Sequence, residues 1–359
     1  MLLTKTPRLL LMAACIAASL NLPTSVARQD VHLDNACACT MGTIPVAVDV
    51  HIPADPTLPL STTDTRRLHH RVQILLHGDT YNSAYWNFPV SGLQNYSYVA
   101  YSCERGLSSF AFDMIGAGLS TRPNSSDIQL FISGNITASL LAMLKDGSIS
   151  HALGGQGTKF PKVIAIGHSL GAVTFNWAAI ALGARAPFDA FIATAHIHDP
   201  GFLVGIDVPL LPANEVDPLR WGALDSGYIT TPNISARASF YSPDNSTFSP
   251  QVLAIDELTK DVGSSAISVG LSAIYEPATG YTGPVAVIVG EKDQVHCDSA
   301  ANNFVPCNAT GVLALEQPFY PDSKNVTAFV IEDTGHDLDF HFSANETFDL
   351  SVELVRKPV

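Results

Sequence analysis

Charged side chains are scarce in this sequence. Asp, Glu, Lys and Arg make up 14% of its 359 residues, whereas about a quarter is usual for a soluble globular protein. Positive charge is the scarcer kind, because 19 Lys and Arg stand against 33 Asp and Glu and leave a formal net charge of −14. The chain therefore has no overall basic field that would attract nucleic acid or an anionic membrane surface. Its apolar share of 47% excludes an intrinsically disordered chain.

Apolar runs of membrane-spanning length are also missing. The run from Leu9 to Leu20 has 12 residues, fewer than the about 20 that a transmembrane helix needs. Lys5 and Arg8 precede it and Ser25-Val26-Ala27 follows, which is the pattern of a cleaved secretory signal peptide. We therefore expect residues 1–27 to be a signal peptide and the product to be extracellular or vacuolar, without a stable membrane anchor. An uncleaved anchor is the less favoured alternative.

Asn-x-Ser/Thr sequons are more frequent than the composition predicts. Eight are present, where chance gives roughly two or three. In a secreted protein they would carry N-linked glycans, which would supply the surface hydration that the low charge content lacks. The sequon asparagines are Asn95, Asn124, Asn135, Asn233, Asn245, Asn308, Asn325 and Asn345.

Cysteine is rare, and five of the six cysteines lie beyond the predicted signal peptide. In an oxidising compartment we expect Cys297 to pair with Cys307 across a short loop. Cys103 should pair with Cys37 or Cys39, a choice that the sequence leaves open, and one cysteine stays unpaired. The single residue between Cys37 and Cys39 is not the two-residue gap of zinc knuckles or thioredoxin-like sites.

Short apolar runs bounded by turn residues predict strands over Ile44–Ile52, Val72–Leu76, Ser109–Phe112, Val163–Ile166, Phe191–Thr194, Val285–Val289 and Val326–Ile331. Between several of them lie helical patterns, namely Ser126–Leu144, Leu170–Leu182 and Ser343–Val355. Glu346 stands three residues after Ser343, the spacing of a capping box. This alternation predicts an α/β fold with a mostly parallel sheet and helices on both faces.

The alternation stops between residues 196 and 282. Pro, Gly, Ser and Asn cluster there, and two short helical patterns appear, over Glu215–Leu224 and Pro250–Val262. We expect an insertion on a single core rather than a second domain. The predicted organisation is a signal peptide (1–27), an N-terminal extension (28–68), the first part of the core (69–195), the insertion (196–282) and the second part of the core (283–359).

The sharpest motif is Gly167-His168-Ser169-Leu170-Gly171, which follows a predicted strand and precedes a predicted helix. A nucleophile elbow needs its serine on a strained turn between a strand and a helix, with glycines where the chain reverses. We therefore expect Ser169 to be a nucleophile that projects from the carboxyl edge of the sheet. The plainer interpretation, a mere glycine turn, leaves the flanking strand and helix unexplained.

A serine hydroxyl needs a base to take its proton and a carboxylate to orient that base. Asp293 and His336 each follow a predicted strand in the order Ser, acid, His. Both would leave their strands at the same edge as Ser169, so we expect these three residues to form a catalytic triad. Three other residues remain alternatives: Glu291 and Asp298 for the acid, and His341 for the base.

Acyl transfer also needs N–H donors for the developing oxyanion. They usually come from the residue after the nucleophile and from the loop after an earlier strand. Leu170 follows Ser169, and the earlier loop is His77-Gly78-Asp79, where Gly78 lets the backbone approach the substrate. We expect the N–H groups of Asp79 and Leu170 to form the oxyanion hole.

Taken in this order, these motifs resemble those of the α/β-hydrolases, in the capped branch of esterases, lipases and epoxide hydrolases. The run from Asp113 to Ser120 is similar to the family's Asp-x-x-Gly-x-Gly-x-Ser loop. The resemblance covers residues 69–359 and implies the α/β-hydrolase fold, with about eight mostly parallel strands and an inserted cap. It also implies the triad and oxyanion roles given above, in a secreted serine hydrolase of fungal type.

The sequence departs from the family pattern at two positions. Epoxide hydrolases of this branch have an aspartate nucleophile, whereas this chain has Ser169, so acyl transfer is the expected chemistry. Asp79 stands where relatives often have an apolar or aromatic residue, and its carboxylate beside an oxyanion would destabilise it unless turned away or protonated. We hypothesise that Asp79 binds the cap or a polar group of the substrate.

His196 and His198 would lie on one face of a continuing strand, a geometry that a metal ion could use. No further ligands are evident in the sequence, so pocket lining or cap anchoring is the favoured interpretation. We expect no metal and no organic cofactor.

These observations predict a secreted glycoprotein that cleaves a carboxylic ester or lactone of a small or apolar molecule through an acyl-enzyme. Three alternatives stay open: an acyltransferase or biosynthetic α/β-hydrolase with the same triad, a peptidase of related fold, and a non-catalytic binding module. The sequence does not identify the substrate or the oligomeric state, and it implies no nucleic-acid partner.

Overall fold

A parallel sheet forms the centre of the protein. The computed structural model describes residues 8–16, 38–46, 71–88, 90, 92–153, 157–199 and 208–357. Six parallel strands follow one another in the order β11-β10-β6-β5-β3-β4. They are β3 (Arg71–Leu76), β4 (Ser108–Phe112), β5 (Lys162–His168), β6 (Ala190–Thr194), β10 (Val285–Gly290) and β11 (Val326–Ile331). Each contains a predicted strand, because strands covered on both faces have nearly continuous apolar runs.

Two antiparallel strands extend this sheet beyond β4. Strand β1 (Arg8–Ile16) pairs with β4 and with β2 (Ala38–Pro45). Strand β2 includes only the start of the predicted strand Ile44–Ile52, and residues 47–52 lie outside the described residues. Strand β1 lies within residues 1–27. The signal peptide stays a prediction, because an apolar run of this length can form either the core of a leader or a strand.

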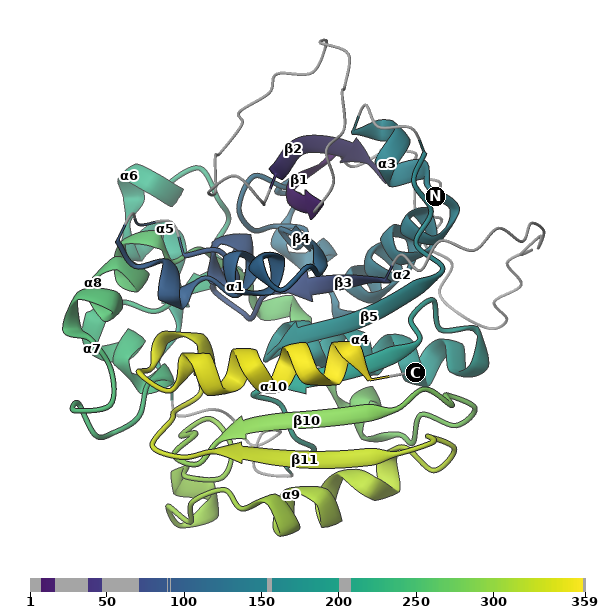
Figure 1. Ribbon diagram of the computed structural model, residues 1–359. Coiled ribbons are helices and arrows are strands. Elements are labelled where there is room, and N and C mark those ends of the chain that lie inside the picture. Colours follow the sequence, from purple (N-terminus) through teal and green to yellow (C-terminus); the bar gives the residue numbers. More distant parts are fainter. Residues whose placement is uncertain are drawn as a thin grey trace.

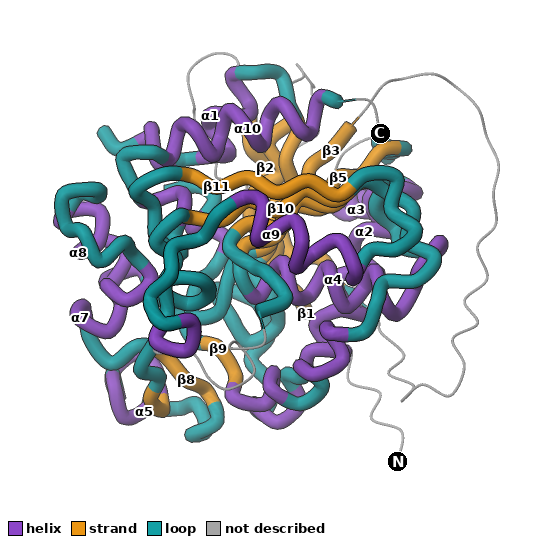
Figure 2. Tube along the Cα trace, turned by 90° about the horizontal axis from the view of Figure 1, so that it is seen from below, coloured by secondary structure: helices purple, strands orange, loops and turns teal. Residues whose placement is uncertain are grey.

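Helices cover both faces of the sheet (Figures 1 and 2). Helices α1 (Tyr98–Glu104) and α10 (Ala344–Arg356) lie on one face, and α2 (Leu130–Asp146), α3 (Ser148–Ala152), α4 (Leu170–Leu182) and α9 (Ala309–Glu316) lie on the other. Side chains of β5 alternate between the two layers. Val163 and Ala165 pack toward α2 and α4, while Ile164 and Ile166 pack toward α1 and α10, as the period of two in a strand requires.

Two predicted helix starts differ from the structure. The capping box expected at the start of α10 is wrong, because the Ser343 hydroxyl hydrogen-bonds the Thr334 hydroxyl and caps no helical N–H. The Ser343 hydroxyl thus bonds a residue of the preceding loop instead of an N–H of its own helix. Helix α2 begins at Leu130 rather than at Ser126, since Ser125–Asp127 form a separate 3-10 turn capped by Asn124.

The part of the segment between β6 and β10 that spans residues 208–264 lies at the carboxyl edge of the sheet (Figures 1 and 2). It contains a small antiparallel sheet of β7 (Leu211–Pro212), β8 (Tyr228–Thr230) and β9 (Gly263–Ser264), and the short helices α5 (Ala213–Val216), α6 (Pro218–Trp221), α7 (Ile234–Arg237) and α8 (Pro250–Thr259). The predicted helix Glu215–Leu224 is divided into α5 and α6. Pro218 explains the break, because proline disfavours a helical conformation in the residue before it.

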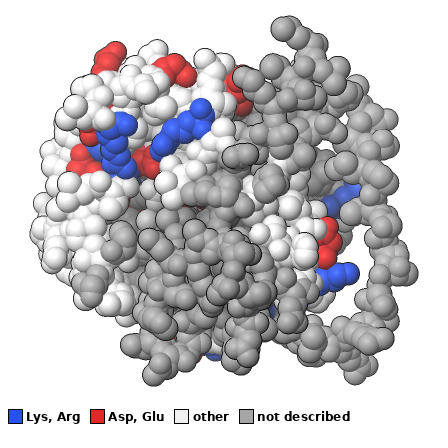
Figure 3. All heavy atoms as spheres, turned by 90° about the horizontal axis from the view of Figure 1, so that it is seen from above, with Lys and Arg blue, Asp and Glu red and all other residues white. Residues whose placement is uncertain are grey.

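The described surface agrees with the low charge content of the sequence. On the face shown in Figure 3 it is mostly uncharged, with a few Lys and Arg side chains beside Asp and Glu. None of the described helices is long and apolar enough to cross a membrane. Seven of the eight sequon asparagines are exposed, and Asn135 is half-buried in α2. Glycosylation stays a prediction.

One expected disulfide is present. Cys297 and Cys307 are joined, with their Cα atoms 5.0 Å apart. Cys103 is also disulfide-bonded. Cys37, one of its two expected partners, lies outside the described residues.

Candidate active site

Ser169 occupies a strained turn between β5 and α4. Its φ is 50° and its ψ is −116°, a region that side chains with a Cβ rarely adopt. A Cβ on Gly167 would lie 2.4 Å from the Ala172 nitrogen, and a Cβ on Gly171 would lie 2.2 Å from the Leu76 oxygen. Both glycines of the motif are therefore required by close backbone contacts, and the turn has the form of a nucleophile elbow.

Asp293 and His336 meet at the same edge of the sheet. Asp293 follows β10 and His336 follows β11, and the His336 Nδ1 lies 3.0 Å from the Asp293 Oδ2. Asp293 Oδ1 also accepts the N–H of Val295 at 2.9 Å and that of His296 at 3.2 Å. The acid and the histidine are thus joined and held by backbone donors. No hydrogen bond connects the Ser169 hydroxyl to His336 in the described part of the chain, and such contacts are often loose in unliganded enzymes.

The two buried groups shift each other's pKa in opposite directions. Burial opposes the charged form of Asp293, but the neighbouring His336 and the Val295 N–H outweigh it and lower the pKa of Asp293. Burial alone would lower the pKa of His336, but the Asp293 carboxylate raises it. The arrangement therefore favours a charged acid beside a histidine that binds a proton readily.

The alternative acids and the alternative base have other contacts. His341 Nε2 accepts the N–H groups of Ser242 and Gly335, and its Nδ1 donates to the Asp337 carbonyl. Backbone groups thus use both of its ring nitrogens. Among the described hydrogen bonds, neither candidate acid reaches His336: Glu291 Oε2 accepts the Asp333 N–H, and the Asp298 side chain makes none.

The loop after β3 approaches Ser169 closely. A Cβ on Gly78 would lie 3.2 Å from the Ser169 Cβ and 2.9 Å from a ring carbon of His168. His77 Nδ1 donates to the Gly78 carbonyl at 2.8 Å, and its Nε2 accepts the Met114 N–H at 3.0 Å. Because the Gly78 C=O and the Asp79 N–H share one peptide plane, His77 fixes the direction of that N–H. The other expected donor, the Leu170 N–H, belongs to the first residue of α4, where N–H groups have no intrahelical acceptor.

The Asp79 side chain points toward residues 262–263. Its Oδ1 is buried and has no hydrogen-bond partner in the described part of the chain, and a Cβ on Gly263 would lie 1.7 Å from it. Burial raises the pKa of Asp79 to about 6, although the Thr80 N–H and Arg237 partly oppose this. The carboxyl group therefore contacts the segment that the sequence marks as an insertion.

A pocket opens beside the two expected oxyanion donors. Besides residues 77–80, its polar lining includes Ser133 and Ser264. The rest of the lining is mostly apolar, with Met114, Ile115, Ala117, Ile128, Leu170, Val262 and Ile267. A hydrophobic part of a ligand could lie here while a carbonyl oxygen faces the N–H groups.

Asp113, the residue after β4, binds both the loop that follows β3 and its own loop. Asp113 Oδ1 accepts the Ser83 N–H at 2.8 Å, and its Oδ2 accepts the Leu119 N–H at 2.9 Å. Gly118 has a φ of 54°, and a Cβ there would lie 2.1 Å from the Asp113 Oδ2. The glycine is therefore needed both for its conformation and for the approach of the carboxylate.

Both ring nitrogens of His198 have hydrogen-bond partners in the protein. Its N–H and Nδ1 lie 2.6 and 2.7 Å from the two oxygens of Glu316, and its Nε2 lies 2.8 Å from the Asn176 Nδ2. These contacts tie the end of β6 to α9. The neighbouring His196 ring lies 5.4 Å from His198 and 5.8 Å from His296.

One group of described side chains has donor atoms close enough to hold a metal ion. The donors of Asp293, His296 and His336 lie within 4.8 Å of one another. The Asp293 carboxylate already binds His336 and two N–H groups, so hydrogen bonding accounts for this arrangement.

Sequence reasoning missed several buried residues around the site. The His168 ring stacks on Tyr85 with centroids 4.2 Å apart and lies 5.1 Å from His336. Burial lowers the pKa of His168 well below its usual value, which favours the neutral ring, and its Nε2 lies 3.4 Å from the Asp337 Oδ1. Arg237 and Asp256, which form a buried ion pair at 2.7 Å, were also missed, since neither stands in a recognisable motif.

Comparisons with known proteins agree with the overall fold. A profile of the Alpha/beta hydrolase family matches residues 73–350. Among solved structures, a methylesterase from Arabidopsis is 13% identical, with a TM-score of 0.52, over 79% of this chain and 98% of that chain. A monoacylglycerol lipase from Paleococcus ferrophilus is 16% identical, with a TM-score of 0.50, over 79% and 93%. No curated protein matches. The chain belongs to the Alpha/beta hydrolase family.

Proposed function

We propose that this protein is a serine hydrolase that cleaves a carboxylic ester or lactone through an acyl-enzyme on Ser169. The observation that carries this proposal is the 3.0 Å contact between Asp293 and His336 at the sheet edge where Ser169 occupies its strained turn. A carboxylate, a histidine and a serine on an elbow are the parts that acyl transfer needs. The esterase and lipase among the structural neighbours suggest the same chemistry.

In the proposed reaction His336 Nε2 takes the proton from the Ser169 hydroxyl as Oγ attacks the carbonyl carbon. Asp293 holds Nδ1–H and stabilises the imidazolium that forms. The N–H groups of Asp79 and Leu170 would stabilise the negative oxygen of the tetrahedral intermediate. His336 then protonates the leaving alcohol, and a water molecule, activated by the same histidine, releases the acid from Ser169.

The lining of the pocket favours an apolar portion in the substrate. Ile115, Ile128, Leu170 and Ile267 contribute hydrocarbon surface close to the expected oxyanion donors. A small molecule with an apolar acyl or ring portion would lose less hydration there than a charged one. We therefore place esters and lactones of small apolar molecules first among substrates.

The proposal includes a cap and a secreted location. Residues 196–282 would form the cap over the site, and residues 1–27 would direct the protein to the secretory pathway. The seven exposed sequon asparagines and the Cys297–Cys307 disulfide are compatible with an oxidising, glycosylating compartment. N-terminal sequencing and glycosidase treatment of the protein secreted by a eukaryotic host test these points.

A fluorophosphonate probe tests the central claim, because it reacts with an activated serine. We expect intact-mass analysis to show one adduct on the wild type and none on Ser169→Ala. His336→Ala should also block labelling, whereas His341→Ala should be labelled if it folds. Labelled wild type would then be followed by a series of p-nitrophenyl esters of rising chain length and by lactones.

An unlabelled but folded wild type would refute the serine mechanism. Circular dichroism and the thermal midpoint establish folding, and a small methylphosphonofluoridate tests whether the larger probe is merely excluded by the cap. Labelling of Ser169→Ala at the same rate as the wild type would mean that another residue is the nucleophile.

A further inference from the structure

Thr80 has a backbone conformation that threonine rarely adopts. Its φ is 61°, in the left-handed region, where a β-branched side chain is disfavoured. Thr80 directly follows Asp79, whose N–H is the proposed oxyanion donor. A strained conformation of this kind persists only where its surroundings hold it.

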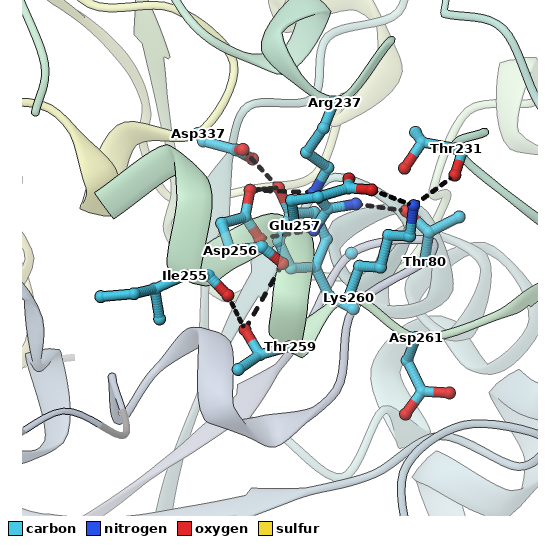
Figure 4. A network of polar contacts seen from close by, with 12 residues as sticks. Thr80, Thr231, Arg237, Ile255, Asp256, Glu257, Thr259, Lys260, Asp261 and Asp337 are labelled. Atoms are coloured by element: carbon cyan, nitrogen blue, oxygen red, sulfur yellow. Dashed lines mark hydrogen bonds and ion pairs between the residues drawn. The ribbon is translucent and has the colours of Figure 1, made fainter. Parts of the chain in front are cut away.

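Two residues of the 196–282 segment hold Thr80. The Asp261 N–H donates to the Thr80 carbonyl at 2.8 Å, and Arg237 Nη1 donates to the Thr80 hydroxyl at 2.8 Å. Figure 4 shows the end of the Arg237 side chain lying between Asp256 and Thr80. The same segment therefore binds both the main chain and the side chain of Thr80.

The Arg237 side chain is itself held by Asp256 and by the Tyr81 ring. It is fully buried, and its Nε and Nη2 donate to the two Asp256 oxygens at 2.8 and 2.7 Å. Its guanidinium carbon lies 3.7 Å from the centroid of the Tyr81 ring, within the range of a cation–π contact. Two charge-assisted bonds and one stacked ring leave the guanidinium little freedom, so the bond to Thr80 has a fixed direction.

The network also reaches the histidine loop. The Tyr81 hydroxyl donates to the Asp337 carboxylate and lies 3.3 Å from the Asp256 Oδ2, and Asp337 is the residue after His336. Arg237 thus contacts, directly or through Tyr81, the loop of the proposed oxyanion donor and the loop of the proposed base. Among the described residues, Arg237 makes no hydrogen bond to the Ser169 elbow, although the Tyr81 ring lies 6.1 Å from the ring of His168.

Asp261 fastens the same segment to the core. Its carboxylate accepts the Gly118 N–H at 2.8 Å, Arg122 Nη2 at 2.9 Å and Asn82 Nδ2 at 3.1 Å. Lifting this part of the segment would take the buried Asp261 carboxylate away from these three donors of the core, which is costly. Around Thr80 the segment therefore acts as a fixed support.

We propose that Arg237 is a positioning residue that acts through Thr80 to aim the Asp79 N–H at the reacting oxygen. The inference rests on the proposed serine-hydrolase function. His77 holds the peptide before Asp79, and Arg237 holds the residue after it, so the donor is anchored from both sides. A donor set in place before the reaction stabilises the transition state more than the bound substrate, so its loss lowers kcat with little change in KM.

The test compares Thr80→Val with Thr80→Ser. Valine keeps the β-branched shape but cannot accept the Arg237 hydrogen bond, whereas serine keeps the acceptor. With p-nitrophenyl butyrate we expect Thr80→Val to lower kcat by about 10- to 100-fold and to change KM less than about twofold. Thr80→Ser should keep most of the wild-type kcat. Arg237→Lys, which keeps the charge but loses the forked geometry, should behave like Thr80→Val.

Thr231→Val is the matched control. Thr231 is a fully buried threonine close to the same network (Figure 4), and its hydroxyl makes no hydrogen bond to any described residue. Only its carbonyl is used, by Lys260 Nζ at 2.6 Å, and valine retains that carbonyl. We expect Thr231→Val to match the wild type in kcat and KM.

Inhibition by an alkyl trifluoromethyl ketone separates positioning from general damage, because its serine adduct carries an oxyanion. For Thr80→Val we expect the inhibition constant to rise by the same factor by which kcat/KM falls. The unpaired Arg237 Nη1 should also lower the thermal midpoint of this variant, so inhibition is measured well below that midpoint. An unchanged kcat, an equal loss in both Thr80 variants, or an inhibition constant that stays at the wild-type value would overturn the inference. Absence of fluorophosphonate labelling on the wild type would instead refute the proposed function.

Discussion

The carboxylate of Asp79 occupies the space beside the Cα of Gly263. Its Oδ1 lies 1.7 Å from the position that a Cβ at residue 263 would take. Asp79 follows β3 of the central sheet, whereas Gly263 begins β9 of the 196–282 segment. The proposed oxyanion loop and this segment therefore meet with no room for a side chain between them.

Gly263→Ala should disturb both stability and catalysis, because its methyl group would displace the Asp79 carboxylate. We expect a loss of about 1–3 kcal/mol in the free energy of unfolding, as for other overpacked sites, and a lower kcat/KM. Urea unfolding and ester hydrolysis measure the two effects. In an Asp79→Ala background the same substitution should cost much less, and equal costs in both backgrounds would contradict the contact.

Asp79→Asn should change how stability depends on pH. The pKa of Asp79 is raised from 3.8 to about 6 by burial, so between these values the unfolded chain loses its proton first. The stability from this group is complete below about pH 4 and is lost as the pH rises through about 6. Asparagine does not titrate, so the variant should gain up to about 3 kcal/mol over the wild type between pH 4 and pH 8.

Urea unfolding at pH 4, 6 and 8 measures this gain. Glu332→Gln, at an exposed position, is the control and should keep the wild-type pH profile. Parallel profiles for wild type and Asp79→Asn would show that the buried carboxyl group does not titrate as inferred. Unchanged turnover and binding in Asp79→Asn would reject the hypothesis that this carboxyl group binds the cap or substrate.

Asp293→Asn should lower kcat by about 1,000- to 10,000-fold, because the amide neither holds the His336 tautomer nor stabilises its imidazolium. The Asp293 carboxylate raises the pKa of His336, so its removal should lower that pKa. The residual activity of Asp293→Asn should therefore persist to a lower pH than the activity of the wild type, because His336 is protonated only at a lower pH. Steady-state kinetics between pH 4 and 9 checks both effects. Asp298→Asn is the comparison variant, and a loss of similar size there would move the role of the acid to Asp298.

Asp256→Ala should be among the most destabilising substitutions at this edge of the sheet. It would leave the fully buried Arg237 without its charged partner, which typically costs about 3–5 kcal/mol. Replacing both partners, as Arg237→Met with Asp256→Leu, should cost less than Asp256→Ala alone. Thermal and urea unfolding of the wild type, Asp256→Ala, the double replacement and its two single replacements, Arg237→Met and Asp256→Leu, test this. A double replacement that costs the sum of these two single ones would mean that no coupled pair exists.

Predictions from local patterns agree with the structure where the pattern is itself the physical cause. The apolar runs that predicted β3, β4, β5, β6, β10 and β11 correspond to strands buried on both faces. The two glycines around Ser169 are the residues that the turn requires. The pairing of Asp293 with His336 could be expected because parallel strands end at one edge.

Predictions from local patterns failed where a distant group competes for the same atoms. Ser343 had the spacing of a capping box, but its hydroxyl bonds Thr334. The Glu215–Leu224 pattern failed for a local reason instead, because Pro218 divides it into two short helices. The sequence also gave no sign of the pair between Arg237 and Asp256, because a buried ion pair has no periodicity and no fixed spacing.

By itself the sequence determined the class of fold, the positions of the six parallel strands along the chain and the residue types at the proposed site. Hydrophobic period and turn chemistry are properties of neighbouring residues, so they can be read without coordinates. Only the tertiary structure decided that Arg237 and Asp261 support Thr80, and that Asp79 lies against Gly263. These contacts join residues far apart in the chain. A buried charge or a close backbone contact depends on which residues the fold brings together, and no local pattern in the sequence records that.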